Sequence, residues 1–128
     1  MSTQDLAFSG AETVRQWFGS WPEFHDAEII SLTLCRLGES VLRVYPYAPE
    51  KPATVEFWLS EITDLEIADF SHQNVIFSLS IEQVTNENGE AVFRLTMLPC
   101  FGLSGRIDAK RLRVNHIPGK SCDGGSQW

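Results

Sequence analysis

The chain lacks the features that direct proteins into or across a membrane. No apolar run among its 128 residues approaches the roughly 20 that a membrane-spanning helix requires. The N-terminal sequence MSTQDLAFSG has no basic segment followed by an apolar one, so it does not resemble a secretory signal. Three widely spaced cysteines (Cys35, Cys100 and Cys122) form no CxxC pair and no disulfide framework. We therefore expect a cytoplasmic protein with free thiols and no membrane partner.

Sequence motifs that carry catalysis or bind cofactors are also missing. There is no HExxH, no GxGxxG and no GxxxxGKS, and the glycines of residues 102–105 precede an expected strand instead of a helix. Asp64 and Glu66 could act as an acid and a base, but they also fit the solvent-facing side of a strand that buries Leu65 and Ile67. The second interpretation is favoured, and we expect no enzymatic activity and no cofactor.

Basic residues are in the minority, and the charge is distributed unevenly. The formal net charge of -7 argues against a nucleic acid as the main ligand, because phosphate contacts need a basic surface. Residues 50–69 contain six acidic side chains and one basic one, whereas residues 106–120 are mainly basic. Either the two regions lie together and neutralise each other, or the first forms an acidic patch for a basic partner.

The N-terminal part of the chain predicts one short helix. Ser9 and Glu12 have the spacing of a capping box, in which each side chain satisfies a free backbone N–H group. Val14, Trp17 and Phe18 would form one apolar stripe. Such a helix, of about ten residues, is too short to be stable alone and should pack on a sheet.

The rest of the chain predicts strands, because apolar residues recur with period two. We expect an α+β fold, mostly a meander-like antiparallel sheet of about seven strands, with the helix packed on it. Residues 1–120 would form a single domain, and the polar, glycine-rich residues 121–128 a flexible tail. The expected strands lie within residues 29–35, 41–45, 55–59, 65–67, 75–82, 91–97 and 105–117. In the fifth of these, the alternation places Val75, Phe77, Leu79 and Ile81 on one face.

The register of one hairpin can be predicted from the alternation of apolar and polar residues in its two strands. Directly opposed residues of an antiparallel pair share a face, so the apolar sets of the two strands must match. A two-residue turn at Asn88–Gly89 would oppose Ile81 to Thr96, which places the wrong residue in the core. A three-residue loop with Gly89 left-handed satisfies the parity. It pairs Leu79 with Met97, Ile81 with Leu95, Glu82 with Arg94 and Val84 with Val92.

The segment WPEFHDAEI concentrates Trp21, His25, Asp26 and Glu28 within eight positions. The last three could bind a metal ion if a further ligand such as His72 or His116 joined them, but there is no HExxH and the three histidines are far apart. A structural role in a turn beside aromatic residues is the favoured interpretation. We therefore expect the purified protein to carry no stoichiometric metal.

Trp58 is the most informative aromatic residue. In the segment VEFWL, Val55, Phe57 and Leu59 share one face of a strand, which leaves Glu56 and Trp58 on the other. Either the helix covers that second face and buries Trp58, or Trp58 is exposed among carboxylates, as in a binding hot spot. Together with Asp64 and Glu66, these two residues define the candidate partner-binding surface: Glu56, Trp58, Asp64 and Glu66.

Several short motifs follow one another along the chain. They are Trp21–Glu28, Thr63–Ile67, His72–Val75 and Gly102–Ile107, with Pro118–Gly119 closing the series. Their order resembles the immunity protein 50 family of bacterial polymorphic toxin systems. The resemblance implies an α+β cytosolic protein that binds and neutralises a cognate toxin. It implies no catalytic residues. Trp21, His25 and Asp26 then serve to hold the fold.

Three hypotheses of different classes follow, of which the weakest is an uncharacterised hydrolase. The first is a non-catalytic immunity-type protein whose partner is a protein toxin, basic in character, with the oligomeric state left open. The second is a small-ligand or metal-binding β-domain that uses His25, Asp26 and Glu28.

Overall fold

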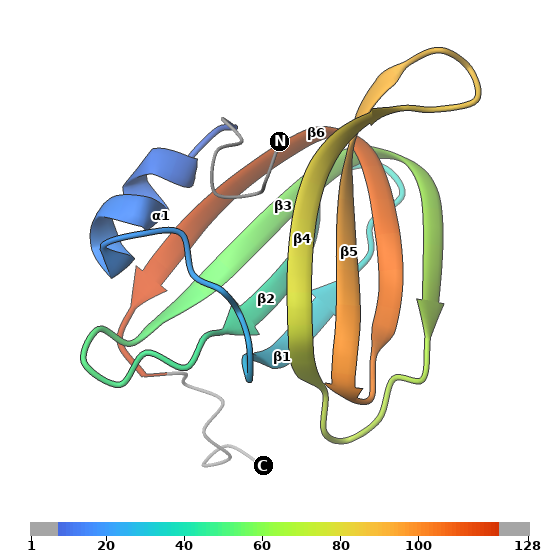
Figure 1. Cartoon of the computed structure of the whole chain (residues 1–128). Coiled ribbons are helices and arrows are strands. Elements are labelled where there is room, and N and C mark those ends of the chain that lie inside the picture. Colours follow the sequence, from blue (N-terminus) through green and yellow to red (C-terminus); the bar gives the residue numbers. More distant parts are fainter. Residues whose placement is uncertain (1–7, 121–128) are drawn as a thin grey trace.

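The computed structural model describes residues 8–120, which form a closed barrel of six antiparallel strands with one short helix (Figure 1). The predicted tail of residues 121–128, with Cys122, lies outside the described residues. No helix within residues 8–120 is long and apolar enough to cross a membrane. The elements are α1 (Ala11–Phe18), β1 (Glu28–Thr33), β2 (Ser40–Tyr45), β3 (Ala53–Ala68), β4 (Val75–Thr85), β5 (Ala91–Phe101) and β6 (Ser104–Pro118).

The strand order is β1-β2-β3-β6-β5-β4, so two three-stranded meanders are joined through the β3–β6 pair. The α+β class is confirmed, but the expected seven strands are six. Residues 55–59 and 65–67 belong to one long strand, β3, whose register against β6 shifts between Ile62 and Asp64. Glu61 has a φ of 56° just before this shift. The irregularity interrupts the period-two pattern, which is why the sequence suggested two strands.

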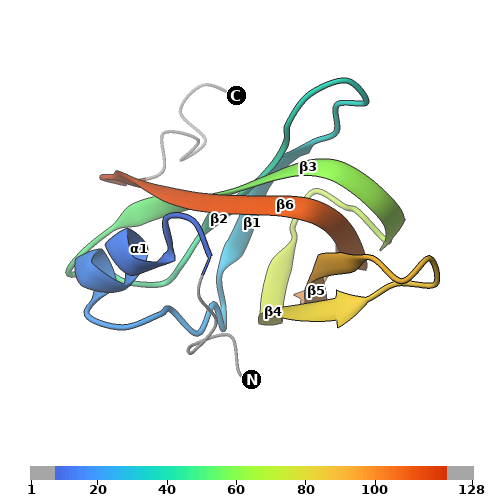
Figure 2. The ribbon, with the colours of Figure 1, turned by 90° about the horizontal axis from the view of Figure 1, so that it is seen from above.

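The β3–β6 pair spans the molecule, from Ala53 opposite Pro118 to Ala68 opposite Ser104. Figure 2 shows these two strands running across the molecule, with α1 towards one end and β4 and β5 towards the other. The first half of β3 pairs with β2, and the first half of β6 pairs with β5. Residues on β3 therefore lie beside residues of β6 that are 36 to 65 positions away in the sequence.

The helix α1 packs against β6 and contributes Ala11 and Val14 to the core. Its predicted capping box does not form. The N-cap is Gly10, which is left-handed and makes no side-chain capping bond. A Cβ atom at Gly10 would lie 1.8 Å from the carbonyl oxygen of Val114, so only glycine permits this close approach to β6. Ser9 instead accepts a backbone hydrogen bond from Val114 at 2.9 Å.

The predicted β4–β5 hairpin is confirmed. Glu82 lies opposite Arg94, Ile81 lies opposite Leu95, and Gly89 has a φ of 78°. One expectation for this region is wrong: the alternation predicted that Phe77 would share a face with Leu79, yet Phe77 is exposed and Ile76 is buried. The register shifts between Ile76 and Ser78, and this bulge turns Phe77 outward.

Three of the motifs that carry the family resemblance meet at one end of the barrel. The buried Asn74 side chain accepts hydrogen bonds from the backbone N–H groups of Ser71 and Leu103, at 3.0 and 2.8 Å. A Cβ atom at Gly102 would lie 2.3 Å from the Asn74 Oδ1 atom. The backbone carbonyl of Asn74 accepts from the N–H of Ile29 at 2.9 Å, and Glu28, the last residue of the first motif, pairs with Val75. These contacts connect β1, β4 and the β5–β6 turn.

Candidate functional site

The acidic and basic regions of the sequence lie side by side, because β3 pairs with β6. Glu61 contacts Arg111 at 3.0 Å, and Asp64 contacts Arg106 at 2.8 Å. Arg106 also pairs with Glu66. Mutual neutralisation, the first of the two interpretations of the charge pattern, therefore describes these residues. The acidic residues of this part of β3 therefore belong to a network of ion pairs and do not form a separate acidic patch.

The candidate residues divide into two clusters on β3. The first, the Trp58 cluster, is built on neighbouring strands by the cross-strand pairs Arg43–Glu56, Glu56–Asn115 and Trp58–Arg113. Directly opposed residues share a face of the sheet, so these side chains lie together on the face that is turned away from Phe57. We define the Trp58 cluster as Arg43, Glu56, Trp58, Arg113 and Asn115.

Trp58 is half-buried and lies between two guanidinium groups. The Cζ atom of Arg113 is 4.7 Å from the centre of the indole rings, and that of Arg43 is 5.8 Å away. Its indole N–H donates to Asn115 at 2.8 Å and more weakly to Glu56 at 3.3 Å. The buried residues of α1 belong to the core with Phe57, so the helix does not cover this face. Trp58 therefore matches neither interpretation fully: the helix does not bury it, but it is only partly exposed, and its neighbours include arginines as well as carboxylates.

Glu56 is the buried carboxylate that connects the side chains of the Trp58 cluster. It is 5% exposed and accepts hydrogen bonds from Arg43 at 2.6 Å and from Asn115 at 2.9 Å. Burial alone would raise the pKa of Glu56, but hydrogen bonds from Asn115, Arg43 and Trp58 outweigh it and lower the pKa below its usual value. Glu56 was predicted to contact a partner directly; its burial instead makes it the residue that positions Trp58.

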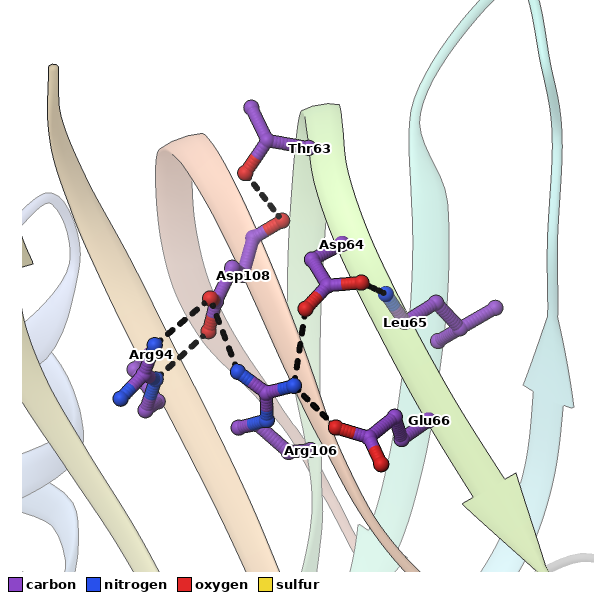
Figure 3. A network of polar contacts seen from close by, with 7 residues as sticks. All are labelled: Thr63, Asp64, Leu65, Glu66, Arg94, Arg106 and Asp108. Atoms are coloured by element: carbon purple, nitrogen blue, oxygen red, sulfur yellow. Dashed lines mark hydrogen bonds and ion pairs between the residues drawn. The ribbon is translucent and has the colours of Figure 1, made fainter. Parts of the chain in front are cut away.

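The second cluster, the Arg106 cluster, lies further along β3 and comprises Asp64, Glu66, Arg94, Arg106 and Asp108 (Figure 3). Asp108 is 3% exposed and receives two hydrogen bonds from Arg94, at 2.9 and 3.0 Å. Arg106 donates to Asp108 at 3.3 Å on one side and to Asp64 and Glu66 on the other. Asp64 and Glu66 are exposed, as the sequence predicted for the solvent-facing side of a strand, but Leu65, which was expected to be buried, is exposed as well.

The basic residues Arg43, Arg94 and Arg113 were not predicted to join the candidate site. Arg43 lies beside Glu56 through the β2–β3 pairing, Arg94 beside Asp108 through the β5–β6 pairing, and Arg113 beside Trp58 through the β3–β6 pairing. The alternation of residues within each strand could have placed these arginines on the polar face of their strands. It could not have identified their neighbours, because that requires the order and register of the strands.

The residues of the Trp21–Glu28 motif separate into a buried and an exposed set. Trp21 and Phe24 are core residues, with Trp21 in edge contact with Phe57 at 6.2 Å between ring centres. The side chains of His25 and Asp26 are more than half exposed and lie 3.3 Å apart. Glu28 is exposed at the start of β1. Trp21 thus holds the fold, as the resemblance implied, whereas the outward-facing His25 and Asp26 do not contribute to the core.

Among residues 8–120, one group of side chains places three metal-ligating atoms close together. It consists of His25, Asp26 and Cys100, whose ligand atoms all lie within 4.8 Å of one another. Glu28, which the sequence suggested as the third ligand, is not part of this group.

The two clusters on β3 are better suited to binding than to catalysis. In both, the buried carboxylate is engaged by arginine side chains, and a carboxylate committed in this way is a poor general base. Trp58 and the arginines beside it offer apolar area and hydrogen-bond donors to an approaching surface. No family model matches the chain, and neither a curated protein nor a solved structure matches it.

Proposed function

We propose that this is a non-catalytic, immunity-type cytoplasmic protein that binds and neutralises a cognate protein toxin through the Trp58 cluster. The observation that carries the proposal is the half-buried indole of Trp58 between the guanidinium groups of Arg43 and Arg113. Tryptophan and arginine are the residues most enriched in binding hot spots, where they sit on well-packed surfaces. Glu56 and Asn115 fix the indole before any partner arrives, so little conformational entropy is lost on binding.

The rest of the β3 surface suits a supporting role in the same contact. Asp64 and Glu66 are exposed and share Arg106, so they would form part of a polar rim. The formal net charge of -7 favours the approach of a basic toxin by long-range attraction. The motif series from Trp21 to Gly119 supports the toxin as the class of partner, through its resemblance to the immunity protein 50 family.

The proposal predicts that a toxin-domain protein is encoded beside the gene, and the test is a binding measurement with that protein. If Trp58 is the anchor, Trp58→Ala should weaken the complex by about 2 kcal/mol or more, chiefly through faster dissociation. Trp17→Ala is the matched control, because Trp17 is also half-buried but stacks on His116 and Lys51, away from the Trp58 cluster. Urea denaturation of each variant separates lost binding from lost folding.

The competing view, that Trp58 only stabilises the fold, predicts a different result. Trp58→Ala would then lower the urea midpoint while the folded fraction kept its full toxin affinity. Unchanged affinity in Trp58→Ala, Arg113→Ala and Arg43→Ala together would exclude this face as the contact. Failure of the neighbouring toxin to bind the wild-type protein would contradict the toxin-neutralising function itself.

A further inference from the structure

We propose that His25, Asp26 and Cys100 form a binding site for a divalent transition-metal ion, with zinc as the ion that these ligands fit. Their imidazole nitrogen, carboxylate oxygen and sulfur atoms lie within 4.8 Å of one another. The sequence predicted no metal, because His25, Asp26 and Glu28 lack the spacing of a metal site and nothing in the spacing supported His72 or His116 as a further ligand. The fold supplies that ligand from β5, 74 positions beyond Asp26. The site is independent of the toxin-binding proposal, since it involves no residue of the Trp58 cluster.

Two backbone irregularities bring Cys100 to this position. Val75 pairs with Phe101 but Ile76 pairs with Pro99, so Cys100 is the extra residue of a bulge on β5. A second bulge, on β4, turns out Phe77. Bulges of this kind re-aim side chains and are frequent beside functional sites. Without the first bulge, continued alternation from Leu98 would direct residue 100 to a different neighbour.

His25 and Asp26 occupy the centre of a tight turn that is fastened to β4. The turn is closed by the N–H of Ala27, which donates to the carbonyl of Phe24 at 3.0 Å. The N–H of Asp26 donates to the carbonyl of Ile76 at 2.9 Å. Phe24 and Asp26 have φ values of 61° and 67°, which non-glycine residues seldom adopt. The turn is therefore held against β4 next to the bulges instead of extending freely into solvent.

The ligand chemistry favours zinc. Imidazole, thiolate and carboxylate are the three donor types that zinc accepts, at about 2.0–2.3 Å from the ion. A tetrahedral site with such bonds separates its ligand atoms by roughly 3.3–3.8 Å. The 3.3 Å between His25 Nδ1 and Asp26 Oδ2 already meets this spacing, and small rotamer changes would bring in the exposed Cys100. A water molecule would complete the coordination.

Phe77 packs against the imidazole of His25 on one side of the proposed site. Its ring meets the imidazole of His25 edge-to-face, with 5.3 Å between the ring centres. Contacts that fix the ring of a ligating histidine raise metal affinity by limiting its rotation. Binding would replace the S–H bond of the Cys100 thiol with a sulfur–zinc bond, and the proton would pass to solvent.

The experiment uses the full chain, freed of metal with a chelator and titrated with Zn²⁺ by calorimetry. We expect about one ion per chain and an affinity reduced more than about tenfold in both His25→Ala and Cys100→Ser. Cys35→Ser and His72→Ala are matched controls, because Cys35 and His72 are also exposed but lie outside the ligand group. Cys122→Ser controls for the third thiol of the chain.

Cobalt provides a second readout that reports on the thiolate directly. Co²⁺ bound to the wild-type protein should give a sulfur-to-cobalt charge-transfer absorption that Cys100→Ser abolishes and Cys35→Ser and Cys122→Ser retain. Equal urea midpoints for the metal-free variants would show that folding is intact, as the exposure of His25 and Cys100 leads us to expect. Absence of Zn²⁺ uptake by the wild type, or full affinity in Cys100→Ser, would overturn the site.

Discussion

The Trp58 cluster and the Arg106 cluster solve the same electrostatic problem in different ways. Each has one carboxylate that is at most 5% exposed, Glu56 in the first and Asp108 in the second. Glu56 accepts from one arginine and from two neutral donors, Trp58 and Asn115. Asp108 is engaged by two arginines, one of them through two hydrogen bonds. Because two of its donors are neutral and one of them is the indole of Trp58, Glu56 positions an aromatic side chain. Asp108 serves mainly to balance the charge of the two arginines.

Among the substitutions that test this comparison, Asp108→Asn is expected to lower the unfolding free energy most. Removing the charge leaves Arg94 and Arg106 without the anion that faces both of them. Breaking a buried ion pair from one side costs about 3–5 kcal/mol of unfolding free energy. Urea denaturation at neutral pH measures the loss. Glu82→Gln is the control, because Glu82 lies opposite Arg94 but is exposed; a loss below about 1 kcal/mol for Asp108→Asn would remove the distinction.

A smaller loss, of about 1–3 kcal/mol, is expected for Glu56→Gln at neutral pH, because the amide keeps part of the hydrogen bonding. Its dependence on pH is the sharper observation. The folded-state pKa of Glu56 lies below its ordinary value of 4.5. Its contribution is therefore present above the unfolded-state pKa and disappears as the pH falls through the lower folded-state pKa. The wild type should lose its advantage over Glu56→Gln as the pH decreases below about 4.5.

Urea midpoints of both proteins at several pH values between neutrality and acid check this expectation. A gap between wild type and Glu56→Gln that stays constant through the acid range would mean that ionisation of Glu56 does not support the fold. Glu12→Gln is a suitable control, because Glu12 is an exposed carboxylate of α1.

The smallest effect on stability is expected for the double change Asp64→Asn with Glu66→Gln. Both residues are exposed and share one guanidinium group, so the unfolding free energy should stay within experimental error of the wild type. Toxin association, in contrast, should become slower and less dependent on salt, because rim charges act mainly on encounter. Stopped-flow measurements of the association rate at two salt concentrations test this. An unchanged association rate would mean that Asp64 and Glu66 do not belong to the rim of the toxin contact.

Much of the fold was predictable from local patterns. The β4–β5 register followed from parity and from one glycine, because a slip of one residue would expose Ile81 and Leu95. The alternation in residues 55–59 placed Phe57 in the core and Trp58 outside it. Prediction failed where the backbone departs from regular geometry: at Glu61 it divided one strand into two, and at Phe77 it assigned the wrong face. Bulges leave no trace in hydrophobic periodicity except an apparent error.

The sequence by itself determined the alternating faces, the hairpin, the short helix and the excess of acidic residues. The tertiary structure alone decided which charges meet, because β3 pairs with β6 across a long stretch of sequence and joins Glu66 to Arg106. It also decided that Cys100, and not Glu28, joins His25 and Asp26. The physical reason is common to both cases: a local pattern specifies the face on which a side chain lies, but strand order and bulges specify its neighbour.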